Sequence, residues 1–191
     1  MAGTKPFALR ARVILPLSQP AIEDGAVFVL KGRIAAIGRW RDLRRKAPAR
    51  VHDLGEAVLL PGLINAHCHL DYTDMAGAIP PPRSFLDWIE AIIAIKAAWD
   101  YSDYAQSWLN GAKQLLRSGC TTVADIEAVP ELLPEVWTAT PLRVVSFLEL
   151  ISVRRRQRPG ALVRQAARKI HELPVGRSRA ALSPHALYTT N

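Results

Sequence analysis

The chain has 191 residues, a net charge of +8 and a hydrophobic fraction of 49%, which is enough apolar content to bury a core and too much for a disordered chain. Its two cysteines, Cys68 and Cys120, are too few for a disulfide framework or a cysteine-rich zinc site. The first 20 residues lack an apolar run of signal-peptide length, and the apolar run 91–99 is too short to span a bilayer and is interrupted by Lys96. We therefore expect a cytoplasmic protein with no membrane partner.

Two stretches, residues 39–46 and 154–158, concentrate the positive charge. A basic patch can bind nucleic acid or another anionic ligand. No aromatic stacking pattern and no nucleic-acid-binding motif accompanies either stretch. We interpret both as solvated surface and expect no nucleic-acid partner.

Residues 1–60 are predicted to form a domain of short strands. Apolar and polar residues alternate over 7–15, which is typical of a half-buried strand. Lys31-Gly32 is a hairpin-type turn between the apolar runs 25–30 and 33–38. A short charged helix or turn over 40–46 and two further strands, 51–55 and 57–60, complete this part.

Two histidines follow a short apolar strand that is broken by Pro61-Gly62. Side chains alternate along a strand, so His67 and His69 are expected on one face together with Asn65, with Cys68 on the other. Two imidazoles on one face can both reach a cation that lies about 2 Å from each nitrogen. A bare His-x-His pair is commonly an ordinary pair of strand residues, but its place at the end of an apolar strand favours a metal site.

Strands and helices alternate over residues 61–191, which predicts parallel β/α units in a second domain. Prolines 80–82 indicate a loop, and Ser84 begins a capping pattern for a helix with an apolar, core-facing stripe. The members of that stripe are Phe85, Trp88, Ile89, Ile92, Ile95 and Trp99. A second helix over 102–118, a short helix over 129–138 and a helix over 160–173 alternate with strands at 120–126 and 141–150, and a further strand with its following loop lies at 179–188.

Three carboxylates lie near the ends of these predicted strands. Asp125 and Glu127 end the strand at 120–126. Either accepts a hydrogen bond from a ligand-binding group or is a solvated loop residue, and the sequence leaves both possibilities open. Glu149 ends the strand at 141–150, where it is a candidate to bind substrate or to orient a ligand.

Three segments carry a resemblance to the amidohydrolase superfamily, in the branch of the cytosine, guanine and S-adenosylhomocysteine deaminases and the chlorohydrolases. They are Pro-Gly-Leu-Ile-Asn-Ala-His-Cys-His-Leu at 61–70, Gly-Cys-Thr-Thr at 119–122 and Ser-Pro-His-Ala at 183–186. The resemblance implies that His67 and His69 bind one catalytic Zn²⁺ or Fe²⁺ at a mononuclear site. It also implies that His185 contacts the substrate without binding the metal. The family's second proline in the last segment is Leu187 in this chain.

The resemblance implies an α/β fold in two parts. Residues 1–60 would be the N-terminal portion of a small β-sandwich domain. Residues 61–191 would be the first half, about four β/α units, of a TIM-type (β/α)8 barrel, because a whole barrel needs about 250 residues.

The implied activity is metal-dependent hydrolysis of a C–N bond other than a peptide bond, with deamination of a heterocyclic amine the first choice. A chlorohydrolase, a cyclic-amide hydrolase and a non-catalytic binding module are the alternatives. The family takes its third histidine ligand, its glutamate base, a further histidine and an aspartate from later strands, so the general base is expected beyond residue 191. We therefore expect a fragment that is inactive alone, with a small-molecule substrate, and a homo-oligomer as a possible state because half a barrel leaves its sheet edges unpaired.

Overall fold

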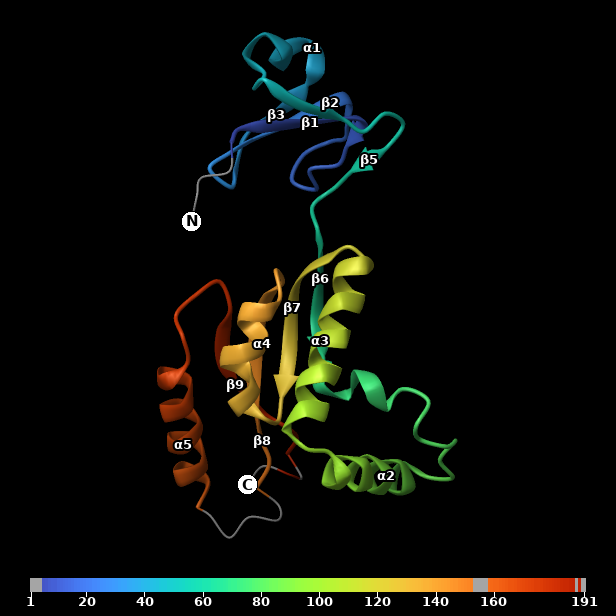
Figure 1. Cartoon of the computed structure of the whole chain (residues 1–191), viewed down its shortest axis with the longest axis vertical. Helices are drawn as coiled ribbons and strands as arrows, with labels where there is room; N and C mark the ends of the chain where they lie inside the picture. Colours follow the sequence, from blue (N-terminus) through green and yellow to red (C-terminus); the bar gives the residue numbers. More distant parts are fainter. Residues whose placement is uncertain (1–4, 153–157, 188, 190–191) are drawn as a thin grey trace. The chain divides into compact units, whose positions relative to one another are not determined.

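The computed structural model describes residues 5–152, 158–187 and 189, so residues 154–157 of the second basic stretch and Tyr188 lie outside the described part. The chain divides into two compact units, Met1–Pro61 and Gly62–Asn191 (Figure 1). No helix in the described part is long and apolar enough to cross a membrane.

The first unit is built on a five-stranded sheet in the order β3-β2-β1-β4, with β5 also paired to β1. Neighbours β1–β2 and β2–β3 are antiparallel, whereas β4 and β5 run parallel to β1. Lys31 and Gly32 have φ values of 51° and 73°, as a tight hairpin turn requires, which confirms the predicted turn. The strands are β1 (Phe7–Ile14), β2 (Ile22–Leu30), β3 (Arg33–Arg39), β4 (Arg50–Asp53) and β5 (Val58–Leu59).

Both faces of this sheet contain buried residues. Ala8 packs beneath the short helix α1 (Trp40–Leu43), which the 3-10 helix η1 (Arg44–Lys46) follows, while Ala11 belongs to a second apolar cluster. The predicted half-buried alternation of β1 is therefore wrong, because each face of the strand has its own apolar cover. The described residues of this unit form one sheet, and the second sheet of a sandwich stays a prediction.

The second unit is a mixed α/β structure on a four-stranded parallel sheet in the order β6-β7-β8-β9 (Figure 1). The predicted alternation of strands and helices is confirmed. The strands are β6 (Leu63–Cys68), β7 (Cys120–Glu127), β8 (Arg143–Leu150) and β9 (Arg179–Pro184). Between them lie η2 (Leu70–Met75), α2 (Phe85–Ala98), α3 (Tyr101–Arg117), η3 (Pro130–Leu132), α4 (Leu133–Ala139) and α5 (Pro159–Glu172), where η marks a 3-10 helix.

The core of this unit lies between the sheet and helices α3, α4 and α5. From the helices it takes Trp108, Val136 and Leu162, and from the strands it takes alternate residues such as Val123, Val144 and Leu148. We call this side the helix-covered face. The opposite side, the open face, carries Ala124, Val145, Phe147 and Glu149, because successive side chains alternate. None of these four belongs to an apolar core cluster of the described residues.

Helix α2 differs from its prediction. The Ser84 hydroxyl accepts a hydrogen bond from the Asp87 amide at 3.1 Å, so the predicted cap is confirmed. The predicted core-facing stripe is wrong, because only Ile92 is buried while Phe85 and Trp88 are 68% and 39% exposed. On the helix-covered face, the layer beside β6 and β7 is occupied by α3 and not by α2.

The segment after β6 is held against α3. It was predicted as a loop, and part of it forms η2. The Ser107 hydroxyl of α3 donates to the Asp71 carbonyl at 2.8 Å and accepts from the Asp74 amide at 3.0 Å. Gly111 permits the close approach, since a Cβ there would lie 3.0 Å from Leu70 Cδ2. The chain that follows His69 is thus fixed to the helix layer.

Candidate functional site

His67 and His69 lie together at the carboxyl end of β6. Their ring centroids are 5.5 Å apart, and the rings are inclined by 73°. His67 is exposed and His69 is half-buried, whereas Cys68 between them packs against the helix-covered core. The Asn65 side chain accepts a hydrogen bond from the His67 amide at 3.1 Å. The two imidazoles are therefore close enough to serve one cation.

The environment of His69 favours its neutral form. Burial lowers the pKa of His69 to about 4, and the positive charges of His67, Lys96 and His185 act in the same direction. The Tyr72 ring stacks on the His69 ring, with centroids 4.8 Å apart and an interplanar angle of 23°. Neutral imidazole is the form that binds metal ions, so this setting suits a metal ligand.

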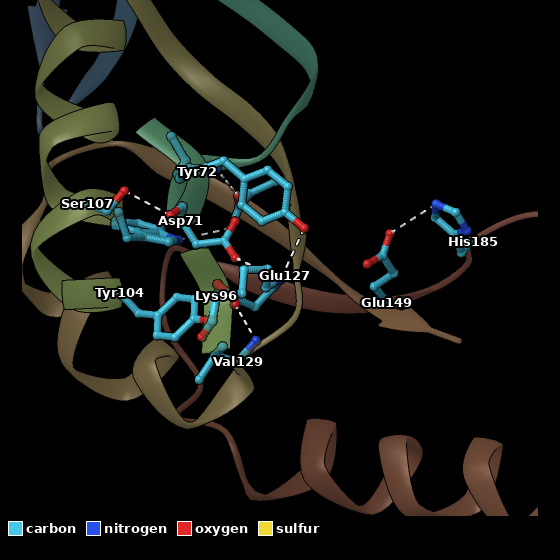
Figure 2. Close-up of polar contacts among 12 residues, drawn as sticks. Asp71, Tyr72, Lys96, Tyr104, Ser107, Glu127, Val129, Glu149 and His185 are labelled. Carbon is cyan, nitrogen blue, oxygen red and sulfur yellow. Dashed lines mark hydrogen bonds and ion pairs between the residues drawn. The ribbon is translucent and has the colours of Figure 1, made fainter. Parts of the chain in front are cut away.

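Glu149 and His185 face each other from the ends of β8 and β9 (Figure 2). Glu149 Oε1 lies 3.9 Å from His185 Nε2, and the Glu149 side chain is largely buried. The His185 amide donates to the Leu150 carbonyl at 3.2 Å, and its Nδ1 lies 2.7 Å from Thr189 Oγ1. The structure thus brings together the two residues that were predicted to contact the substrate.

The donors present make up part of a metal site. Within residues 5–152, 158–187 and 189, no three His, Cys, Asp or Glu side chains are grouped to hold a metal ion. A catalytic zinc site takes three protein ligands and one water. His67 and His69 can supply two of these three.

Asp125 and Glu127 lie on the helix-covered face and are buried, so the alternative of solvated loop carboxylates is wrong. Asp125 Oδ1 accepts from the Leu70 amide at 3.0 Å, and its Oδ2 accepts from Trp108 Nε1 at 3.0 Å and Ser146 Oγ at 3.4 Å. Asp125 is therefore an acceptor that ties the residue after His69 to α3 and β8.

The pKa values of these two carboxylates are raised. Burial raises the pKa of Asp125 to about 7 against the lowering effect of its hydrogen bonds from Leu70, Trp108 and Ser146. Burial also raises the pKa of Glu127, with smaller contributions from the negative charges of Asp125 and Asp71. Glu127 Oε1 accepts from the Val129 amide at 2.6 Å (Figure 2). Both carboxylates thus lie on the helix-covered face, where each accepts a hydrogen bond from a backbone amide.

Three residues beside His69 were missed as a group by sequence reasoning: Asp71, Tyr72 and Lys96. Lys96 Nζ donates to the Tyr72 hydroxyl at 3.0 Å and lies 4.0 Å from Asp71 Oδ2 (Figure 2). Asp71 is 1% exposed, and burial raises its pKa to about 7. The available signal was Lys96 itself, a charge placed within an otherwise apolar run. Its partners lie 24 and 25 residues earlier in the chain, where no local pattern connects them to it.

The family model of the Amidohydrolase family matches residues 58–190, which is more than half of the chain. The chain belongs to this family. The match contains the whole parallel sheet and both histidines, so the resemblance drawn from residues 61–70 is confirmed.

A 5-methylthioadenosine/S-adenosylhomocysteine deaminase from Nitratidesulfovibrio vulgaris (strain DSM 19637 / Miyazaki F) is 29% identical over 199 residues. The alignment covers 98% of this chain and 44% of that relative. The chain thus spans less than half the length of this relative.

Two solved structures are similar in fold. Helicobacter pylori aminofutalosine deaminase, in complex with methylthio-coformycin, has a TM-score of 0.79 at 24% identity, over 95% of this chain and 44% of that one. Atrazine chlorohydrolase from Arthrobacter aurescens TC1, complexed with zinc, has a TM-score of 0.80 at 20% identity, over 97% of this chain and 48% of that one.

Proposed function

We propose that this chain is the first half of a metal-dependent hydrolase that deaminates a heterocyclic amine of purine or pyrimidine type. The observation that carries the proposal is the pair His67 and His69 at the carboxyl end of the first parallel strand of an amidohydrolase-family chain. In this proposal residues 61–191 contribute about four β/α units of a (β/α)8 barrel. Residues 1–60 contribute the N-terminal portion of a small β-sandwich domain.

His67 and His69 would hold a Zn²⁺ or Fe²⁺ ion, which when bound lowers the pKa of a coordinated water towards neutrality. His69 suits this role because its burial favours the neutral imidazole. Glu149 and His185 would bind the substrate, since a carboxylate and an imidazole 3.9 Å apart can accept from and donate to the nitrogens of one heterocycle. Small-molecule binding would then take place on the open face.

The proposed reaction needs groups that the described residues do not supply. A third metal ligand and a carboxylate base would have to come from another part of the enzyme. We therefore propose that the chain alone binds metal weakly and does not turn over substrate. The unpaired edges of β6 and β9 would favour self-association of the isolated chain.

A chlorohydrolase is the second candidate, and the similarity in fold to a zinc-complexed atrazine chlorohydrolase favours it. Both reactions attack an sp² carbon of a heterocycle and differ in the leaving group, ammonia or chloride. A non-catalytic binding module is the third. Sequence that follows Asn191 in the source genome separates an enzyme from a module, because a histidine–glutamate motif there would complete the site.

Metal binding is the direct test on the purified 191-residue chain. Zinc bound at equilibrium is measured for the parent, for His67→Ala and His69→Ala, and for His52→Ala as a histidine control on β4 in the other unit. We expect weak zinc binding that is lost in the first two variants and kept in His52→Ala. Equal binding by all four proteins would contradict the proposed site.

Turnover is tested on the same preparation with aminopurines, aminopyrimidines and chlorotriazines, with ammonia and chloride as readouts. We expect neither product from this chain alone. Ammonia release by the 191-residue chain would refute the view that its site is incomplete. Once a polypeptide that continues the sequence is added, ammonia release would support the deaminase and chloride release the chlorohydrolase.

A further inference from the structure

The imidazole of His69 is oriented in an unusual way for a metal ligand. Metal-binding histidines commonly donate their second ring N–H to a carboxylate or carbonyl, which fixes the ring. In the described part of the chain, two other rings lie next to the His69 ring, those of His67 and Tyr72. The Tyr72 stack, at 4.8 Å and 23°, is the contact that lies against the plane of the ring.

Tyr72 is itself anchored by Lys96 from α2. Lys96 Nζ donates to the Tyr72 hydroxyl at 3.0 Å and lies 4.6 Å from the centre of its ring. The base of Lys96 is held by α3, because the Tyr104 hydroxyl donates to the Lys96 carbonyl at 3.0 Å. Figure 2 shows Lys96 reaching Tyr72 and Asp71 from one side. A continuous series of contacts thus runs from α3 through Lys96 and Tyr72 to His69.

We propose that Tyr72 and Lys96 are positioning residues that hold the plane of the His69 imidazole for metal binding. This inference rests on the proposed metal site. A stacked ring contacts the face of the imidazole, while the nitrogen lone pair lies in the ring plane, so the stack restrains the ring and leaves both nitrogens available. The Lys96 ammonium keeps Tyr72 in place by binding its hydroxyl and by cation–π attraction.

This arrangement assigns a function to α2. The helix buries only Ile92, yet it carries Lys96, which donates a hydrogen bond to the Tyr72 hydroxyl. Lys96 is also its link to Asp71, at 4.0 Å. The position of α2 therefore determines how firmly the His69 ring is held.

The first experiment measures Zn²⁺ affinity of the 191-residue chain by competition with a chromophoric chelator. Tyr72→Ala removes the stack and is expected to weaken zinc binding by about 10-fold, at the lower end of the 10- to 100-fold effect of removing an outer-shell partner. Tyr72→Phe removes the hydrogen bond from Lys96 and keeps the cation–π contact, whereas Lys96→Met removes both, and each should give a smaller loss than Tyr72→Ala. The double variant should lose no more than Lys96→Met alone, because the hydrogen bond that Tyr72→Phe removes is already absent without Lys96.

Two variants serve as controls. Tyr101→Phe removes a tyrosine hydroxyl that donates to Glu135 at 2.9 Å on the surface and is expected to leave zinc affinity unchanged. Lys96→Arg keeps the cation and should restore affinity relative to Lys96→Met, a rescue that a purely structural role of the aliphatic stem would not produce. A folded Tyr72→Ala protein, judged by circular dichroism, that binds zinc as tightly as the parent would overturn the proposal.

A second readout needs no metal. The ring protons of His69 lie against the Tyr72 ring, so their NMR resonances carry its ring-current shift. Tyr72→Ala is expected to move them and Tyr101→Phe to leave them in place; unchanged resonances in Tyr72→Ala would refute the stack. If the parent chain binds no zinc, the proposed metal site is wrong. The NMR result still decides whether Tyr72 holds the His69 ring.

Discussion

On the helix-covered face of the parallel sheet, the Asp125 carboxyl is held by three partners, the Leu70 amide, Trp108 Nε1 and the Ser146 hydroxyl. On the open face, Glu149 Oε1 and His185 Nε2 approach each other at 3.9 Å from the ends of β8 and β9. The same strands supply both sets. β8 places Ser146 and Leu148 among the helices and Glu149 on the opposite side.

The two faces therefore differ in the roles of their polar residues. Those on the helix-covered face stabilise the structure, and those on the open face are proposed to bind substrate. Asp125 is a carboxylate at the end of a parallel strand, the position where barrel enzymes place catalytic groups. Its side chain nevertheless points towards α3, where it fixes the residue after His69. A residue's face decides its role as much as its place at the strand end. The following predictions test this contrast in order of expected size.

The largest expected effect is on the pH dependence of stability. Burial raises the pKa of Asp125 from 3.8 to about 7 in the folded chain, so the folded state binds more protons than the unfolded state between these values. Stability therefore falls as pH rises from about 4 to about 7, by on the order of 4 kcal/mol for this group. Urea unfolding at several pH values measures the effect.

His69 opposes this trend, because burial lowers its pKa to about 4 and its contribution to stability rises with pH. The parent is therefore compared with Asp125→Asn, which removes the Asp125 titration and with it one cause of the raised pKa of Asp71 and Glu127. We expect a steeper loss of stability with pH in the parent. Parallel curves for the two proteins would show that Asp125 does not titrate in this range.

Neighbouring residues on β8 give the next test. Leu148 is 4% exposed in the helix-covered core, and Leu148→Ala is expected to cost about 3 kcal/mol of unfolding free energy. Phe147 is half-buried on the open face, and Phe147→Ala should cost about 1 kcal/mol at low protein concentration. Equal losses, measured by urea unfolding, would mean that both faces are packed.

The Phe147→Ala result also bears on self-association. If copies of the chain cover each other's open faces, the loss grows with protein concentration, because association stabilises the folded state. Sedimentation at two concentrations gives the oligomeric state independently. A loss that stays constant over a hundredfold range of concentration would argue against association through this face.

Asp125→Ala is expected to cost about 2 kcal/mol at pH 5, where the neutral carboxyl is lost with its hydrogen bonds and the Leu70 and Trp108 donors are left buried. Glu149→Gln, at the end of the next strand on the open face, should change stability by less than about 0.5 kcal/mol. Thermal unfolding of the two variants provides the comparison. A larger loss of stability for Glu149→Gln than for Asp125→Ala would contradict the view that Asp125 is the structural residue of the two.

The smallest effects concern two helix caps. Asp100 caps α3 by accepting from the Ser102 and Asp103 amides, and Asp100→Ala should cost about 1 kcal/mol. Ser84 caps α2, which buries only Ile92, so Ser84→Ala should affect global unfolding by less than about 0.5 kcal/mol. Matching losses would indicate that α2 unfolds together with the sheet.

Local patterns were sufficient for much of the fold. The Lys31-Gly32 turn, the Ser84 cap and the alternation of strands and helices after Pro61 each depend on residues within a few positions of one another. The His67 and His69 pair was also predictable, because two residues at i and i+2 of a strand share a face whatever lies around them. The family resemblance followed from this segment together with those at 119–122 and 183–186.

Only the tertiary structure shows which segments pack against each face of a strand or helix. From the sequence, Asp125 was either a hydrogen-bond acceptor or a solvated loop residue. The packing of α3 against β7 decided between these, because it places Trp108 beside Asp125. The apolar run in α2 was predicted to face the core, but α3 already occupies that layer. Tyr72 and Lys96 meet across 24 residues. Periodicity specifies which side chains share a face, whereas the identity of the neighbour depends on contacts between segments that are distant in the chain.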